Sequence, residues 1–305
     1  MRVFVTGASG HIGLPVVREL LAAGHKVVGL ARSEASAEKI ASAGAEVLRS
    51  NLDDLDRLRA AARDADGVIH LAFKHDIAFS GDFAGAITAD LRTVEAIGEA
   101  LGGSGKPFVN TTGTMLLAHS VRGRAGTEDD AGQEGGNPRV ASENLSLAFA
   151  ERGVRTSIMR LAPTVHSSLD HHGFIPMIVA AARKNGFSAY VGDGSARWPA
   201  VHTLDAARLY RLALEAAPAG SRVHAAAEEG VAFRSIAEAI GRGLGVPARS
   251  IAPEKMADVL GGFLGTIAQL DNLTSSARTR ELLGWKPTHA DLLADIAEGH
   301  YFASK

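Results

Sequence analysis

The sequence contains no cysteine, which excludes disulfide bonds, thiolate metal sites and a cysteine nucleophile. It has no apolar run near the roughly 20 residues that a membrane helix needs, and Val3 to Val5 is too short for a signal-peptide core. The 32 lysines and arginines form no run and the formal net charge is -2, so there is no basic field to attract nucleic acid or anionic lipid. These absences predict a cytoplasmic protein without nucleic-acid or membrane partners.

The composition is that of an ordinary globular protein. The 305 residues are 46% hydrophobic and 22% charged, which is enough apolar material to bury a core. No fixed-period repeat or low-complexity segment divides the chain.

The first 160 residues alternate short β-branched runs with longer amphipathic stretches, which predicts βα units feeding a parallel sheet. The expected strands are Arg2 to Thr6, Lys26 to Leu30, Glu46 to Leu48, Gly67 to Leu71, Pro107 to Thr112 and Arg155 to Arg160. The expected helices are Ile12 to Ala23, Leu55 to Arg63, Thr88 to Leu101 and Pro138 to Arg152, with Gly24 as a left-handed residue ending the first.

The alternation stops after Arg160, which predicts a second region. Helices are expected at Ile175 to Lys184, Leu204 to Ala216, Phe233 to Leu244 and His289 to His300, with short apolar runs at Ala189 to Val191, Ala200 to His202 and Val223 to Ala226. The predicted fold is therefore α/β: a Rossmann-type, doubly wound parallel sheet over residues 1–165. A smaller mixed α/β substrate region is expected over residues 166–305, with some segments returning to the first core.

A glycine-rich turn follows the first strand and opens the first helix. Gly7 permits the tight turn, Gly10 lets the backbone approach a pyrophosphate, and Gly13 lets the helix pack on the strand. Ser9, His11 and Ile12 complete the turn, and the helix N-terminus offers N-H groups to phosphates. The context predicts a nicotinamide dinucleotide site.

The end of the second strand predicts which dinucleotide is bound. Sites for NAD carry an acidic residue here for the ribose hydroxyls, whereas this chain has Ala31-Arg32-Ser33. Arg32 can pair with a 2′-phosphate and Ser33 can add a hydrogen bond, so we expect NADP(H); alternatively, Arg32 is a solvated loop charge.

With these residues in place, the chain resembles the extended short-chain dehydrogenases/reductases, the group that includes nucleotide-sugar epimerases and dehydratases. The resemblance covers nearly the whole length, from the glycine-rich turn to Thr279-Arg280-Glu281-Leu282-Leu283-Gly284-Trp285 near the end. It implies adenine contacts from Asn51 and Leu52, and a segment over the adenine and ribose made by Leu71, Ala72 and Phe73. It also implies a nicotinamide-binding loop containing Pro163 and Val165, and a dimer formed through the helices Thr88 to Leu101 and Pro138 to Arg152.

The chain departs from that family at the proton-transfer residues. The family uses a Tyr-x-x-x-Lys pair after the fifth strand, but the only tyrosines here are Tyr190, Tyr210 and Tyr301. Aligned on this helix, Arg139 takes the tyrosine position and Glu143 the lysine position. The family's hydroxyl residue corresponds to Thr111 or Thr112; we favour Thr112 for the substrate and expect Thr111 beside the cofactor, although a threonine ending a strand can be purely structural.

Several side chains compete for the missing role. Arg139 does not act as an acid, but it can hold a substrate carboxylate or carbonyl, or pair with Glu143 one turn away. His166, directly after the nicotinamide loop, is the first candidate acid; it can also be a structural histidine. His75 and Tyr190 are weaker candidates, and Tyr190 can equally be a pocket wall. Asp170-His171-His172 does not suggest a metal site, because adjacent histidines point apart.

The leading functional hypothesis is an NADPH-dependent reductase of a small or medium organic carbonyl compound, with a non-standard proton donor. The second is a non-catalytic NADP-binding redox sensor or regulator, because losing the Tyr and Lys can mean losing turnover. The third is a nucleotide-sugar epimerase or dehydratase, which fits the architecture but not the missing pair.

Overall fold

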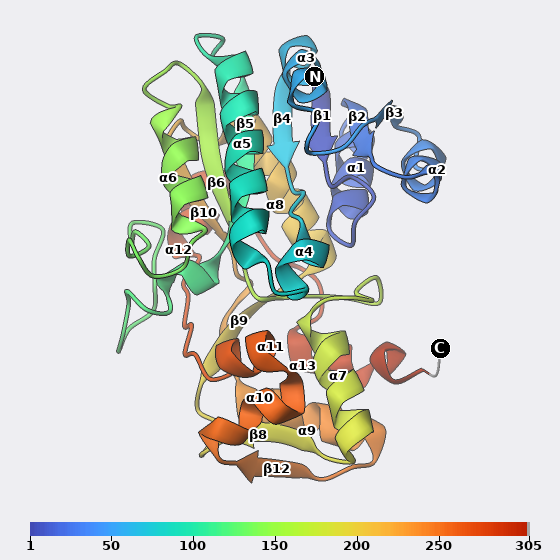
Figure 1. Ribbon diagram of the computed structural model, residues 1–305, viewed down its shortest axis with the longest axis vertical. Coiled ribbons are helices and arrows are strands. Elements are labelled where there is room, and N and C mark those ends of the chain that lie inside the picture. Colours follow the sequence, from blue (N-terminus) through green and yellow to red (C-terminus); the bar gives the residue numbers. More distant parts are fainter. Residues whose placement is uncertain (304–305) are drawn as a thin grey trace.

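The structure is a computed structural model, and it describes residues 1–303. Its larger lobe is built on a seven-stranded sheet in the order β10-β6-β5-β4-β1-β2-β3, in which every pairing is parallel (Figure 1). The strands are β1 (Arg2–Thr6), β2 (Lys26–Ala31), β3 (Glu46–Arg49), β4 (Gly67–His70), β5 (Pro107–Gly113), β6 (Arg155–Leu161) and β10 (Ser221–Ala225). This confirms the predicted doubly wound α/β fold. The strand order reverses between β1 and β4, and ligands of such sheets bind outside the carboxyl ends of the strands at that point.

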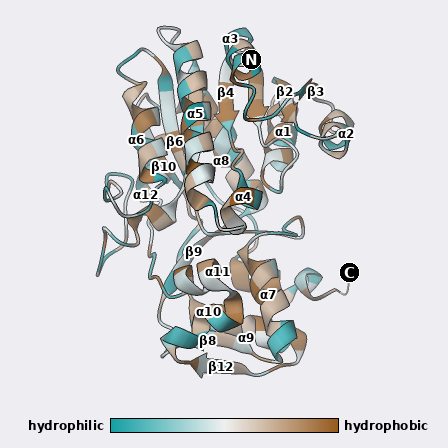
Figure 2. Cartoon of the chain, in the orientation of Figure 1, coloured by the Kyte–Doolittle hydropathy of each residue, from teal (hydrophilic) through white to brown (hydrophobic). Residues whose placement is uncertain are grey.

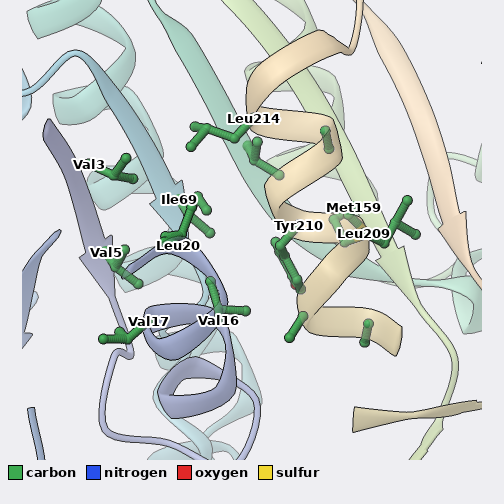
Figure 3. Close-up of a cluster of buried hydrophobic side chains, with 14 of the residues drawn as sticks. Val3, Val5, Val16, Val17, Leu20, Ile69, Met159, Leu209, Tyr210 and Leu214 are labelled. Carbon is green, nitrogen blue, oxygen red and sulfur yellow. The ribbon is translucent and has the colours of Figure 1, made fainter. Parts of the chain in front are cut away.

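Helices cover both faces of this sheet. They are α1 (Gly13–Ala22), α2 (Glu34–Ser42), α3 (Leu55–Asp64), α4 (His75–Phe79), α5 (Phe83–Leu101), α6 (Val140–Ala148), α8 (Thr203–Ala216) and α12 (Ala277–Leu283), with a 3-10 turn at Thr114–Leu117. One core lies between the sheet and the pair α1 and α8, where Val16, Leu20 and Tyr210 are buried (Figure 3). A second core, with Leu58 and Phe108, lies under α3 and α5.

The smaller lobe holds a three-stranded sheet, β11-β9-β7, and a two-stranded sheet, β12-β8. Its elements are β7 (Thr164–His166), α7 (Phe174–Asn185), β8 (Ser188–Val191), β9 (Arg197–His202), β11 (Glu228–Ala232), α9 (Phe233–Leu244), β12 (Ala248–Ile251), α10 (Met256–Leu260), α11 (Gly262–Ile267) and α13 (Leu292–Ala297), with 3-10 turns at Pro253–Lys255 and His300–Phe302. Much of α7 is hydrophobic (Figure 2), and it packs in a separate core with Trp198 and Phe233. Three elements beyond residue 165, α8, β10 and α12, pack in the larger lobe.

The expected elements differ from the observed ones mainly at their ends. α5 begins at Phe83 rather than Thr88, because the Asp82 side chain caps it by accepting from the Gly85 N-H at 2.8 Å. α6 ends at Ala148 rather than Arg152, since Phe149 and Ala150 bond three residues back instead of four. The last expected helix shortens to Leu292–Ala297. Gly24 has a φ of 81°, which confirms the predicted left-handed residue after the first helix.

Within residues 1–303, none of the helices combines the length and apolar character that crossing a bilayer requires.

Candidate functional site

The glycine-rich turn lies at the carboxyl end of β1, beside the point where the strand order reverses. Gly7 has a φ of 69°, and a Cβ there would lie 2.9 Å from the Ala72 nitrogen. A Cβ on Gly13 would lie 2.0 Å from the Gly7 carbonyl oxygen, so the start of α1 sits directly on the turn. No side chain caps α1 at Ile12, but the Leu14 N-H donates to the Gly10 carbonyl at 3.0 Å and Pro15 has no N-H, so the Gly13 N-H is the donor that the first turn leaves for a ligand. The turn therefore has the form of a phosphate cradle.

Two ion pairs that the sequence did not indicate cross the part of the crevice where adenosine is expected. Arg32, just after β2, donates from Nη1 to Asp76 Oδ2 of α4 at 2.9 Å. Lys74 donates to both carboxylate oxygens of Asp53, at 2.7 and 2.8 Å. Asp76 lies 44 residues from Arg32, so no local pattern could have identified it.

The other residues expected around adenosine have structural partners. The Ser33 hydroxyl caps α2, accepting from the Ser36 N-H at 3.2 Å. Asn51 accepts from the Asp53 N-H at 2.8 Å and so shapes the turn after β3, while the Leu52 carbonyl accepts from Thr93. Leu71 follows the end of β4.

A buried hydrogen-bonded chain supports the floor of the crevice. Thr6 Oγ1 lies 2.6 Å from His70 Nδ1, and His70 Nε2 lies 3.3 Å from Asp90 Oδ1 on α5. Burial alone would raise the pKa of Asp90. The hydrogen bond from His70 and the charge of Arg139 outweigh burial, so the pKa of Asp90 lies below its usual range. The same Thr6 hydroxyl accepts from the Ala72 N-H, which fixes the segment after β4 against the turn.

Arg139 lies at the carboxyl end of β5. Its Nη2 donates to the Thr111 carbonyl at 2.7 Å, and its guanidinium lies 4.5 Å from the centre of the Phe73 ring. His75 contacts that ring edge-on at 5.1 Å. Burial, and then the positive charge of Arg139, lower the pKa of His75. A cation, an imidazole and an aromatic face thus meet beside the two threonines of β5.

Glu143 does not pair with Arg139, so the structure does not realise the ion pair that was one of the two alternatives for that arginine. Arg160 donates to both of its carboxylate oxygens, and Arg222 donates to Oε1 at 2.8 Å. Burial alone would raise the pKa of Glu143, but the two arginines lower it below the usual range. Thr112 also donates to Glu143, at 3.3 Å. The Glu143 carboxylate is thus bonded to arginines of β6 and β10. Arg139 therefore has no ion pair with Glu143, and its guanidinium can face the crevice.

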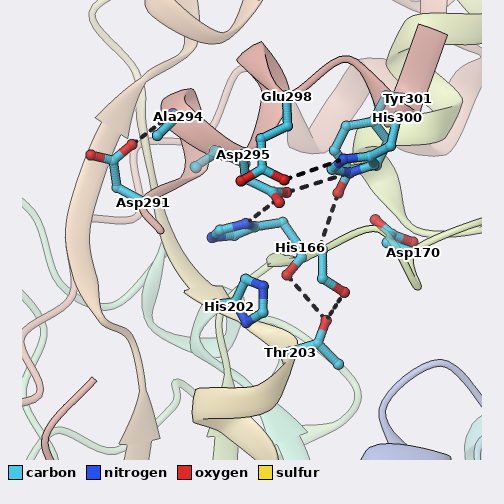
Figure 4. A network of polar contacts seen from close by, with 12 residues as sticks. His166, Asp170, His202, Thr203, Asp291, Ala294, Asp295, Glu298, His300 and Tyr301 are labelled. Carbon is cyan, nitrogen blue, oxygen red and sulfur yellow. Dashed lines mark hydrogen bonds and ion pairs between the residues drawn. The ribbon is translucent and has the colours of Figure 1, made fainter. Parts of the chain in front are cut away.

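His166 lies in a different network, at the junction of the two lobes (Figure 4). Its Nδ1 is 3.0 Å from Asp295 Oδ2, and its carbonyl accepts from the Thr203 hydroxyl. His11 of the glycine-rich turn reaches the same hydroxyl at 2.8 Å. Within residues 1–303, no hydrogen bond or ion pair joins His166 to Thr112 or Arg139. His166 therefore lacks the contacts expected of the acid.

The remaining expected residues are widely separated. Pro163 and Val165 flank Thr164, whose hydroxyl donates to the Pro199 carbonyl at 2.6 Å and anchors the loop after β6. Thr111 donates to or accepts from the Tyr210 hydroxyl at 2.8 Å. Tyr190 lies in β8, at the end of the smaller lobe far from the large sheet (Figure 1), with Arg234 against its ring. Tyr190 is too remote to transfer a proton beside Thr112.

One cluster of potential metal ligands comprises His202, Asp205 and His289. The two histidine rings are stacked, 7° from parallel with centres 4.6 Å apart. Imidazole lone pairs lie in the ring plane, so a common ion cannot lie in both planes. Asp205 moreover accepts from the N-H groups of Thr288 and His289, which explains its burial without a metal.

Comparison with known proteins places these features in a family. The sequence model of the NAD dependent epimerase/dehydratase family matches residues 3–226. An uncharacterized protein of Schizosaccharomyces pombe is 47% identical over 302 residues, covering 99% of this chain and 100% of that one. An uncharacterized protein of Saccharomyces cerevisiae is 41% identical over 298 residues, covering 97% and 98%. Relatives of lower identity are named as reductases as well as epimerases.

Solved structures agree on the fold. A double mutant of a dTDP-glucose 4,6-dehydratase from Streptomyces venezuelae, with NAD and DAU bound, superposes with a TM-score of 0.79 at 20% identity. The alignment covers 98% of this chain and 96% of that one. Because the family match also spans most of the sequence, the protein belongs to the NAD dependent epimerase/dehydratase family.

Proposed function

We propose that this protein is an NADPH-dependent reductase of small or medium organic carbonyl compounds. The observation that carries the proposal is the placement of Arg139, anchored on the Thr111 carbonyl and the Phe73 ring at the carboxyl end of β5. There it stands beside Thr112, close to where the sheet's switch point would hold a nicotinamide.

The residues of the turn fit a dinucleotide. Gly7 and Gly13 leave no room for a Cβ, and the Gly13 N-H at the uncapped start of α1 is available as a donor to a pyrophosphate. Arg32 and the absence of an acidic residue at the end of β2 favour the 2′-phosphate of NADPH.

The side chains divide the chemistry between them. Arg139 holds the substrate carbonyl oxygen and stabilises the negative charge that develops on it. Thr112 adds a second hydrogen bond only if its hydroxyl turns away from Glu143, to which it donates at 3.3 Å. The bound cofactor supplies a hydride for the carbonyl carbon. Arg139 keeps its proton, so His75, on the same Phe73 ring, is the proton donor to the oxygen. His166 is assigned a structural role with Asp295.

A second function, a non-catalytic NADP-binding regulator, is favoured by one observation. The carboxylate at the family's lysine position is buried in ion pairs with Arg160 and Arg222, so it cannot replace that lysine. A nucleotide-sugar epimerase or dehydratase is less well supported, because it needs reversible proton transfer that arginine does not provide. Dimerisation through α5 and α6 and a cytoplasmic location remain part of the proposal.

The test is NADPH oxidation with a panel of aldehydes, ketones and imines. Arg139→Ala should lower kcat/KM for an accepted substrate by roughly 100-fold, since it removes an oxyanion donor, and leave the NADPH Kd within about twofold. Arg152→Ala is the matched control, because Arg152 also stacks on a phenylalanine, Phe149, at 4.7 Å. It should retain full activity.

The pH profile tests the proton donor. Because the pKa of His75 is lowered below its usual range, the imidazole is mostly neutral at pH 7 and gains the proton it donates only at more acidic pH. Reduction should therefore accelerate toward acidic pH in the wild type and not in His75→Gln. Tight NADPH binding without turnover on any panel member would instead support the regulator.

A further inference from the structure

Residues 71–76, here called the strap, cross the crevice from one strand to two others. The strap leaves the end of β4, and its Lys74 and Asp76 reach Asp53 after β3 and Arg32 after β2. Since the sheet order is β4-β1-β2-β3, the strap must pass over the carboxyl end of β1, where the glycine-rich turn lies. It also touches that turn, through the bond from the Ala72 N-H to Thr6.

The two ion pairs of the strap differ in strength. Lys74 is largely buried and bonds both oxygens of Asp53, which fastens the strap at β3. The Arg32 and Asp76 side chains are 69% and 57% exposed and share one bond, so their pair opens at little cost. The Arg32 guanidinium, bonded to Asp76, lowers the pKa of that carboxyl and keeps it ionised.

Arg32 is also the residue proposed above to bind the 2′-phosphate. A phosphomonoester carries more charge than a carboxylate, so it can displace Asp76 from the guanidinium, but the displaced carboxylate then stays near a like charge. NADH has no such group. Its ribose hydroxyls need an acceptor, which at the end of β2 is provided by Asp76 and not by the strand itself.

We propose that Asp76 sets the choice between NADPH and NADH by competing with the 2′-phosphate for Arg32. Asp76 of α4 thereby supplies the carboxylate that the end of β2 lacks. As a result, the preference for NADPH over NADH is weaker than Arg32 alone would give. This inference rests on the proposed function for its cofactor, but its test requires no turnover.

The test is the Kd of each cofactor, measured at one ionic strength from nicotinamide fluorescence. Asp76→Asn releases Arg32 and removes the repelling charge, so NADPH should bind roughly three- to tenfold more tightly. NADH should bind equally or more weakly, because an amide is a poorer acceptor than a carboxylate. Asp53→Asn is the matched control: it breaks the other ion pair of the strap and should change both Kd values by the same factor, to within about twofold.

A double-mutant cycle tests the route through Arg32. In an Arg32→Ala background, adding Asp76→Asn should change NADPH affinity by less than about twofold, because there is no guanidinium to release. An unchanged ratio of the two Kd values in Asp76→Asn overturns the inference, as does a full gain in the Arg32→Ala background. If both cofactors bind as expected without carbonyl reduction, the inference stands and only the catalytic proposal fails; if neither binds, both fail.

Discussion

Glu143 illustrates how a single buried charge depends on its partners. Arg160 is fully buried against it and Arg222 adds a third group, so removing the negative charge leaves a buried cation uncompensated. We expect Glu143→Gln to lower the free energy of unfolding by about 3–5 kcal/mol, as for other broken buried ion pairs. Urea unfolding at pH 7 measures this. Glu19→Gln, which breaks the more accessible pair with Arg211, should cost less than about 1 kcal/mol; an equal loss in both variants would contradict the argument.

The same residue shows where sequence reasoning succeeds and fails. The helix that carries Glu143 was predicted from the sequence, but the partners of its carboxylate were not, because Arg160 and Arg222 lie 17 and 79 residues away. The glycine-rich turn was recognisable because its parts are adjacent in sequence and the steric demand is local. Side-chain pairing across a sheet depends on strand order, which spacing along the chain does not encode.

At the scale of elements, α8 begins with an unusual cap. The His202 ring accepts from the Leu204 N-H through Nδ1 at 3.2 Å, so a proton on that nitrogen would break the cap. Burial, and then the neighbouring His289, lower the pKa of His202 to about 4. The unfolded chain takes up this proton near pH 6.5 but the folded chain only near pH 4, so stability is lost as the pH falls between them.

His202→Asn should remove part of that pH dependence, since asparagine caps helices and does not titrate. Between pH 7 and pH 5 the wild type should lose about 1 kcal/mol more than the variant, after allowance for the half-buried position. Chemical unfolding at the two pH values measures the difference. The exposed His119→Asn should follow the wild type, and parallel pH curves for His202→Asn and wild type would refute the assignment.

Long elements were predictable and short ones were not. The buried strands β1, β2, β4, β5 and β6 contain apolar runs in the sequence, because both faces of a parallel sheet are covered. α10 and α11 have 5 and 6 residues, too few to show a helical period. α2 was missed, because its Ser33 cap was interpreted only as a ligand contact.

At the scale of the molecule, the end of the chain joins the two lobes. Leu283 and Trp285 pack in the core of the larger lobe, whereas Leu292 and Ile296 pack in that of the smaller one. Aromatic side chains also meet across the junction, with Phe83 of α5 6.2 Å from Phe263 of α11. The lobes should therefore unfold together.

Trp285→Phe tests this coupling. The indole N-H donates to the Asp205 carbonyl at 3.0 Å, and its loss with some packing should cost about 2 kcal/mol. Because the chain has 2 tryptophans, Trp198 of the smaller lobe becomes the sole fluorophore. Its fluorescence midpoint should coincide with the circular-dichroism midpoint of the whole chain, at a lower urea concentration than for the wild type. Separate midpoints would mean that the lobes unfold independently.

The hydrogen bonds of the Thr203 hydroxyl, shown in part in Figure 4, determine which ring nitrogen of His11 in the glycine-rich turn carries a proton. Its one hydrogen goes to the His166 carbonyl, so His11 must donate to it from Nε2, which leaves His11 Nδ1 as an acceptor 3.6 Å from Asp170. Burial raises the pKa of Asp170 to about 6 and lowers that of His11 to about 4. The Asp170 carboxyl therefore gains its proton at a higher pH than the His11 imidazole, so acidification to about pH 6 removes a negative charge from beside the phosphate cradle and should favour the binding of an anion there.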